Sequence, residues 1–248
     1  MHFVPWRLEE VRDIDSTNTA VAQRAALGEP EGLLLRADHQ TAGRGRQGRT
    51  WEAPPAVNFL GSLLFVPNLE ERDRWLVPAT VALAARAGLV RLCGVRPLLK
   101  WPNDLVVNDR KLAGMLTEVV VRPDGSVALV VGLGLNLGWH PALEQPTTSV
   151  LAEAGVSVTP SAFVDQLQSE IDHRRAWWND EDGRTRLRTE IRSALGTLGR
   201  GVRVERAHDV LDGEAVALRD DGALVVETTE GVHEVALGDV THLRQVAS

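Results

Sequence analysis

The 248-residue chain has a single cysteine, Cys93. One thiol excludes an internal disulfide framework and a cysteine-rich zinc site, and it fits a reducing cytoplasm. The N-terminal residues lack the basic stretch followed by an apolar stretch that marks a signal peptide. No run approaches the ~18 consecutive apolar residues of a membrane span, so we expect no membrane partner.

Lysine is almost as scarce as cysteine. Of the 27 basic residues, only Lys100 and Lys111 are lysines, and both lie in the segment KWPNDLVVNDRKLAG. An ammonium is a compact charge on a flexible stem, whereas a guanidinium is a broad planar fork. An arginine-rich chain that keeps two lysines in one segment therefore predicts positions where a guanidinium does not serve, with chance clustering as the alternative. The net charge of −7 disfavours a DNA or RNA partner unless a local basic patch opposes it.

The apolar pattern predicts an α+β chain. A helix is expected over 15–28, with Asp15, Ser16 or Thr17 as N-cap and Gly28 near its C-terminal end. Further expected helices are 75–93, 160–178 and 182–195, and expected strands include 32–38 and 57–65. From about residue 199 the chain becomes a series of short strands separated by D-G and E-G turns, which is typical of a small β-barrel.

The segment GRGRQGRTW (43–51) contains a GxGxxG pattern. A dinucleotide site of the Rossmann type needs a helix directly after these glycines, but Pro54 and Pro55 stand there. A Walker-type sequence is also absent. What remains is a flexible loop with three arginines and a tryptophan, which suits a nucleotide or an acyl-adenylate. The alternative is an arginine-rich solvated loop, for which RNA is one conceivable partner.

A second segment brings a cation, an amide and a carboxylate to one turn, in the order Lys100, Asn103, Asp104. Lys111 follows seven residues after Asp104, across an expected Asn-Asp hairpin turn, and could return to the same cleft. The alternative is a structural ion pair between Lys100 and Asp104, with Lys111 in solvent. The stretch GLGLN (132–136) marks either a place where a ligand approaches the backbone or close strand packing.

These motifs together resemble biotin protein ligases. The resemblance rests on DSTN (15–18), GRGRQGRTW (43–51), KWPNDLVVNDRKLAGMLTE (100–118) and VVGLGLNL (130–137), in the order of that family. It implies a mixed-sheet catalytic domain with flanking helices, similar to class II aminoacyl-tRNA synthetases, over 1–198. It also implies an SH3-like barrel over 199–248. Only about 15 residues precede the STN motif, so we expect a monofunctional ligase without the DNA-binding domain of bifunctional members.

The family reaction implied by the resemblance joins biotin and ATP into biotinyl-5′-AMP and then transfers the biotinyl group to a lysine of a biotin carboxyl carrier protein. Matched position by position, the residues implied to bind biotin are Ser16, Thr17, Asn18, Gln40, Arg44, Gly45, Arg46, Lys111 and Gly114. Those implied to bind ATP are Arg46, Arg49, Trp51, Asn103, Lys111 and Asn136, and those implied to be catalytic are Lys111, Arg46 and Asp104.

The roles of three residues stay open at this point. Asp104 could hold Mg²⁺ or accept a proton from the incoming lysine, while Lys100 and Trp101 could contact ligand or only support the turn. A lipoate-type protein ligase and a non-catalytic biotin sensor are the alternative functions. We expect a cytoplasmic protein, and a homodimer is compatible with the resemblance.

Overall fold

The computed structural model describes residues 4–143, 145–206, 209–236 and 238–242. The strands of its larger sheet are β1 (Arg7–Ile14), β2 (Leu33–Gln40), β3 (Phe59–Phe65), β4 (Leu98–Lys100), β5 (Asp104–Val107), β6 (Arg110–Val121) and β7 (Val127–Leu135). The helices are α1 (Thr17–Ala26), α2 (Leu76–Cys93), α3 (Val150–Ala154), α4 (Pro160–Arg175) and α5 (Glu181–Ala194). The strands of the smaller sheet are β8 (Gly201–Glu205), β9 (Val210–Leu218), β10 (Leu224–Thr228), β11 (Gly231–Val235) and β12 (Asp239–His242). Short 3₁₀ helices lie at Arg46–Gly48, Glu71–Asp73 and Ala176–Trp178.

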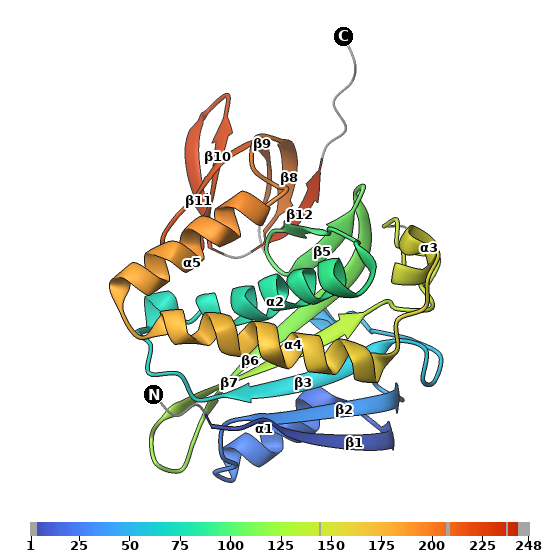
Figure 1. Ribbon diagram of the computed structural model, residues 1–248. Coiled ribbons are helices and arrows are strands. Elements are labelled where there is room, and N and C mark those ends of the chain that lie inside the picture. The colour runs from blue at the N-terminus through green and yellow to red at the C-terminus, as the bar shows by residue number, and fades with distance from the viewer. Residues whose placement is uncertain (1–3, 144, 207–208, 237, 243–248) are drawn as a thin grey trace.

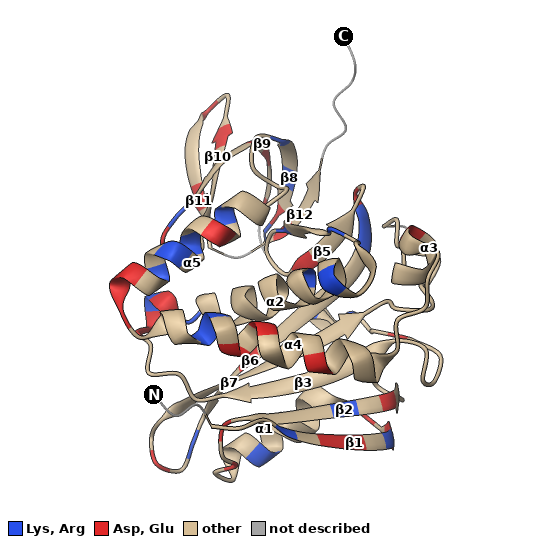
Figure 2. Cartoon of the chain, in the orientation of Figure 1, with Lys and Arg blue, Asp and Glu red and all other residues tan. Residues whose placement is uncertain are grey.

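The larger sheet is mixed, with the strand order β1-β2-β3-β7-β6-β5-β4. β1 pairs with β2 in parallel, and the other neighbours are antiparallel. Helix α1 covers one face, and α2 and α4 cover the other (Figure 1). All residues of β3 are buried because helices pack on both of its faces, and Figure 2 shows that β3 carries no charged residue. The α+β class expected from the sequence is thus confirmed.

The helix predicted over 15–28 begins as expected. Ser16 is its N-cap, and the side-chain oxygen of Ser16 accepts a hydrogen bond from the amide of Thr19. Helix α2 agrees with the prediction over 75–93 and ends at Gly94, whose φ of 76° suits glycine. The Asn-Asp turn between β5 and β6 is also confirmed, since Asn108 and Asp109 both have positive φ.

Helix α2 is more apolar than the search for consecutive apolar residues indicated. The segment Glu71–Cys93 is long and apolar enough to cross a membrane by length and composition alone. Arg86 and Arg91 interrupt its apolar run, so a search for consecutive apolar residues overlooks it. In the structure, 56% of its most apolar window is buried inside the molecule, and the core helix of a soluble protein passes the same test.

The smaller sheet, with the order β11-β10-β9-β8-β12, is antiparallel throughout. It packs beside the end of the larger sheet that carries β4 and β5 (Figure 1). The Trp101 indole donates a hydrogen bond of 3.0 Å to the Gly222 carbonyl, and the Trp75 indole donates one of 3.0 Å to the Asp220 carbonyl. These contacts fix the smaller sheet against the KWPND turn and the start of α2. Its last strand, β12, lines the functional site.

Candidate functional site

A cavity of about 700 Å³ opens at the N-terminal end of α1. It extends from the first turn of α1, beneath the loop 43–51, to β12 of the smaller sheet. Every site residue expected from the sequence lines this one cavity: Ser16, Thr17, Asn18, Gln40, Arg44, Gly45, Arg46, Arg49, Trp51, Asn103, Asp104, Lys111, Gly114 and Asn136. Segments far apart in the sequence therefore meet at a single place.

One end of the cavity is closed by a chain of polar side chains at the start of α1. The Gln40 amide oxygen accepts hydrogen bonds from the Thr17 amide at 2.7 Å and from the Thr17 hydroxyl at 3.0 Å. The Thr17 hydroxyl also lies 2.8 Å from the Ser62 hydroxyl. Ser62 was not expected from the sequence, because it lies within an apolar run that reads as a core strand. This end can hold a small polar ring.

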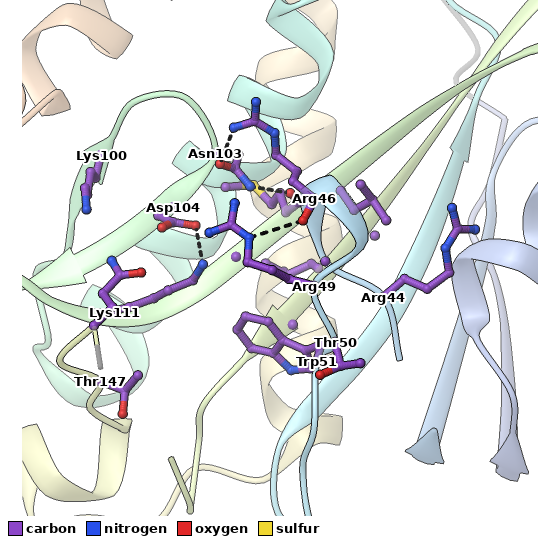
Figure 3. Close-up of a pocket in the computed structure, with 18 of the residues that line it drawn as sticks. Arg44, Arg46, Arg49, Thr50, Trp51, Lys100, Asn103, Asp104, Lys111 and Thr147 are labelled. Atoms are coloured by element: carbon purple, nitrogen blue, oxygen red, sulfur yellow. Dashed lines mark hydrogen bonds and ion pairs between the residues drawn. The ribbon is translucent and has the colours of Figure 1, made fainter. Parts of the chain in front are cut away.

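Glu118 extends the same chain and was also missed. Its carboxylate accepts hydrogen bonds from the Asn18 side-chain amide and, at 3.0 Å, from the Arg44 guanidinium. Arg44 in turn donates a bond of 3.2 Å to the Thr19 hydroxyl, and Figure 3 shows that its side chain points away from the other loop arginines. Strand alternation could have indicated Glu118, since it shares its face of β6 with Gly114.

The floor of the cavity is made by glycines on two adjacent strands. Gly114 of β6 pairs with Gly134 of β7, and the Trp51 indole lies directly over both. A Cβ atom at Gly134 would come within 2.3 Å of Trp51 Cε2, and one at Gly114 within 2.9 Å of Trp51 Cζ3. Trp51 Nε1 is buried and has no hydrogen-bond partner in the described part of the chain. Bare backbone here lets a flat group lie against the sheet.

Lys111 reaches the cavity because β6 contains a β-bulge. Leu105 pairs with Ala113, whereas Val106 pairs with Lys111, which leaves Leu112 as the extra residue. Without this irregularity, Lys111 would share the core-facing side with Ala113. Lys111 Nζ instead lies 2.8 Å from the Asp104 carboxylate and 5.6 Å from the centroid of a Trp51 ring. The alternative of an ion pair between Lys100 and Asp104 with Lys111 in solvent is therefore wrong (Figure 3).

Two loop arginines meet the smaller sheet at the other end of the cavity. Arg46 donates hydrogen bonds to Asn103 Oδ1 at 3.1 Å, to Asp239 Oδ1 at 3.2 Å and to the Gly238 carbonyl at 3.2 Å. Arg49 lies 2.5 Å from the other oxygen of Asp239. No sequence signal indicated Asp239, because it follows Arg49 by 190 positions in an ordinary strand. Two guanidinium groups side by side form an anion-binding end.

Comparison with known proteins agrees with this geometry. Residues 11–136 match the model of the biotin/lipoate A/B protein ligase family, and residues 197–243 match that of the biotin protein ligase C-terminal domain. A biotin--[acetyl-CoA-carboxylase] ligase of Mycobacterium tuberculosis is 34% identical over 257 residues, covering 96% of this chain and 90% of that protein. This chain belongs to the biotin protein ligase family.

Two further similarities accompany this assignment. A biotin--[acetyl-CoA-carboxylase] ligase of Paracoccus denitrificans is 33% identical, covering 91% of this ligase chain and 96% of that one. The solved structure of the biotin protein ligase from Aquifex aeolicus in complex with biotin and ATP has a TM-score of 0.81 at 24% identity. It covers 96% of this chain and 99% of that one. The latter likeness confirms the expected fold, including the separate C-terminal sheet.

In this biotin protein ligase chain, Lys100 and His242 lie where the two sheets meet. Both line the cavity, and burial lowers the pKa of the Lys100 ammonium below its usual range. Burial likewise lowers the pKa of His242, although the Asp109 carboxylate opposes this effect from 3.2 Å. Trp101 is 7% exposed, and its backbone amide donates a hydrogen bond of 3.0 Å to the Thr197 hydroxyl. Trp101 thus supports the turn and contacts the smaller sheet, and like Lys100 it also lines the cavity.

Asn136 lies at the edge of the ligase cavity and is only 1% exposed. Its amide donates a hydrogen bond of 3.0 Å to the Thr148 carbonyl, and its oxygen lies 3.4 Å from the Asn58 amide. Asn58 in turn accepts hydrogen bonds from the backbone amides of three successive residues starting at Leu137. The side chain of Asn136 therefore holds the loop after β7 in place, beside whatever the cavity binds.

Proposed function

We propose that this protein is an ATP-dependent ligase that activates biotin as biotinyl-5′-AMP and transfers it to a lysine of a biotin carboxyl carrier protein. The observation that carries the proposal is the order of groups along one cavity. A polar closed end is followed by a glycine floor, a lysine–carboxylate pair and two arginines. A ureido ring, an apolar body, a carboxylate and a chain of phosphates follow one another in the same order when biotin meets ATP.

In the first step, the biotin carboxylate attacks the α-phosphorus of ATP, and the bond to the pyrophosphate leaving group breaks. Lys111 is suited to bind the carboxylate and the α-phosphate together, because its ammonium lines the cavity between Asp104 and the Trp51 ring. It would stabilise the negative charge that develops on the phosphate oxygens. Arg46 and Arg49 would bind the remaining phosphates, and the Trp51 indole would stack on the adenine.

In the second step, the acceptor lysine attacks the biotinyl carbonyl and AMP leaves. The attacking amine must lose a proton, and Asp104 lies beside Lys111 at the point of attack. We assign to Asp104 the binding and deprotonation of this amine. The loop 43–51 would exclude water from the mixed anhydride between the two steps.

Mg²⁺ would enter as part of the ATP substrate. Within the described residues, there is no group of three or more His, Cys, Asp or Glu side chains that could hold a metal ion. A cavity without such a group still fits Mg²⁺, because this ion is usually held by substrate phosphates together with only one or two carboxylates. The ion would neutralise phosphate charge, and Asp104 is the carboxylate beside Lys111.

We also propose a division of the chain after residue 198 and a cytoplasmic location. The division is supported by the change from α5, which ends at Ala194, to β8, which begins at Gly201. The location is supported by Cys93, which is a free thiol.

The test uses the purified 248-residue chain with biotin, ATP and Mg²⁺. We expect pyrophosphate release that depends on biotin, followed by labelling of a biotin carboxyl carrier domain when one is added. Free lipoate should not compete with biotin. Biotin binding without pyrophosphate release would instead indicate a sensor, and inhibition by equimolar lipoate would indicate the lipoate branch.

A further inference from the structure

Glu118 is a half-buried carboxylate that the two-step reaction leaves without a role. It lies on β6, and its two oxygens are divided between two partners: one accepts from the Arg44 guanidinium and the other from the Asn18 amide. Arg44 can only donate hydrogen bonds, and an ionised carboxylate can only accept them. Glu118 therefore determines which end of the Asn18 amide faces it.

This contact fixes the direction of the Asn18 side chain. Because the NH₂ group must face Glu118, the oxygen Oδ1 faces the floor of the cavity beside Gly132. A Cβ atom at Gly132 would come within 2.7 Å of this oxygen. Glycine at this position thus leaves room for the oxygen, and both Asn18 and Gly132 line the cavity.

The Asn18 oxygen has spare hydrogen-bonding capacity. A side-chain amide oxygen can accept two hydrogen bonds, and within the described residues the Asn18 oxygen receives one, from the Ser62 hydroxyl at 3.2 Å. Asn18 is only 4% exposed. An acceptor that is buried and partly unfilled favours a ligand with an N–H group at this end of the cavity.

We propose that Glu118 is a positioning residue that sets the specificity of the site for a ring with N–H donors. By holding the Asn18 amide in one orientation, it presents an acceptor to the ureido ring of biotin. The dithiolane ring of lipoate has no N–H group and would leave that acceptor unpaired, and sites of this kind strongly reject such analogues. This inference rests on the proposed ligase function.

The test is Glu118→Gln, which keeps the shape and removes the charge. Arg44 will donate a hydrogen bond to the glutamine oxygen, so the glutamine NH₂ group faces Asn18. The Asn18 oxygen then accepts from that NH₂ group, and the Asn18 amide turns its own NH₂ group towards the cavity. We expect KM for biotin to rise by roughly 10- to 100-fold, as for the loss of one buried hydrogen bond. KM for ATP and kcat should stay within about two-fold, because both belong to the other end of the cavity, and the preference for biotin over lipoate should fall.

The second variant is a rescue. In Asn18→Asp combined with Glu118→Gln, the glutamine NH₂ can donate to the new carboxylate, whose other oxygen again offers an acceptor to the cavity. We expect KM for biotin to return most of the way to the wild-type value. The matched control is Glu234→Gln, which removes an exposed carboxylate that lies 2.5 Å from Arg219 on the smaller sheet. It should leave both KM values unchanged.

The outcomes distinguish failure of the proposed ligase function from failure of the proposed role of Glu118. If the wild-type chain forms no biotinyl-5′-AMP, the proposed function is wrong. If it does, but Glu118→Gln leaves KM for biotin unchanged or alters kcat and both KM values equally, the role of Glu118 is wrong. Failure of the double variant to recover would overturn the amide-orientation argument, provided that its thermal melt matches that of the wild type. If Glu118→Gln alone does not fold, the KM of the folded double variant decides the question.

Discussion

Lys111 shows how one residue combines composition, strand geometry and chemistry. It is one of two lysines among 27 basic residues, and a β-bulge turns it from the core-facing side of β6 to the cavity. There it faces both the carboxylate of Asp104 and the ring of Trp51. Such a position leaves little room for a wider cation.

We expect Lys111→Arg to impair adenylate formation by on the order of 10²-fold, although the charge is kept. A guanidinium would spread its charge and push the biotin carboxylate out of line, and ~1 Å of misplacement can have an effect of this size. Single-turnover pyrophosphate release measures the change, with thermal melts to check folding. Lys100→Arg is the matched substitution and should lose less activity. Near-native adenylation by a folded Lys111→Arg protein would contradict the role.

Asp104→Asn should separate the two half-reactions. Adenylate formation should fall by less than about 10-fold, because Lys111 stays in the cavity without its partner. Transfer to the carrier domain should fall by at least about 10²-fold, as for loss of a general base. The two rates are measured as pyrophosphate release and as labelling of the carrier domain. An equal loss in both, relieved by raised Mg²⁺, would favour the metal-ligand role instead.

At the scale of elements, the loop 43–51 is held at both ends. Arg44 contacts α1 and β6, while Arg46 and Arg49 contact β12. Within the loop, Gly43 is required, because a Cβ atom there would come within 2.2 Å of the Trp51 carbonyl oxygen. The loop is therefore suited to act as a cover, because a bound ligand would replace the protein groups that its arginines now contact.

Arg46→Gly should weaken retention of the adenylate more than its formation. The variant loses contacts to Asn103, Asp239 and the Gly238 carbonyl, while Lys111 is untouched. We expect activated biotin to escape and label lysines of a bystander protein such as serum albumin, detected by blotting with streptavidin. If the variant labels only the carrier domain at an unchanged rate, Arg46 does not retain the adenylate.

The elements that could be predicted are those with a local signal. Ser16 marks a helix start, a largely apolar segment marks α2, and the Asn-Asp turn marks a hairpin, so α1, α2 and the β5–β6 pair were found. β1 was not predicted as a strand, because it lies at a sheet edge and its charged residues do not alternate with apolar ones. α3 and β12, of five and four residues, are too short to show a period.

The residues of the site could likewise be predicted only where the sequence carries a local signal. Most functional residues within the quoted motifs were found, but Glu118 at the end of one motif and the partners outside the motifs were not. Ser62 was hidden in an apolar strand, and Asp239 acts from a strand that folding alone brings to the loop. The bulge that redirects Lys111 has no local sequence mark, since it depends on how β5 and β6 pair.

At the scale of the whole molecule, the two sheets are joined through charged contacts as well as apolar ones. Asp109, in the turn between β5 and β6, forms a bidentate pair with Arg200 at 2.6 and 2.8 Å. The hydrogen bond from Arg200, followed by that from His242, lowers the pKa of Asp109 to about 2. The carboxylate is thus more acidic in the folded protein than in the unfolded chain.

We expect Asp109→Asn to lower the free energy of unfolding at pH 7 by less than about 1 kcal/mol, because the pair is half exposed. A carboxylate with a lowered pKa stabilises the fold above its unfolded pKa of 3.8, and this contribution is lost as the pH falls towards about 2. Urea unfolding of both proteins between pH 7 and pH 3 should therefore show a difference that shrinks below pH 4. A difference that stays constant with pH would contradict this assignment.

The bond between Arg49 and Asp239 spans 190 positions of sequence, and this has a consequence during synthesis. At roughly 5–20 residues per second, a ribosome needs on the order of 10–40 s to add the residues between them. For that time the emerging chain carries the glycine–arginine loop without the carboxylate that holds it. A nascent chain with its first sheet already folded would therefore have an uncovered cavity, in which any activated acyl group would be exposed to water until the last strand docks.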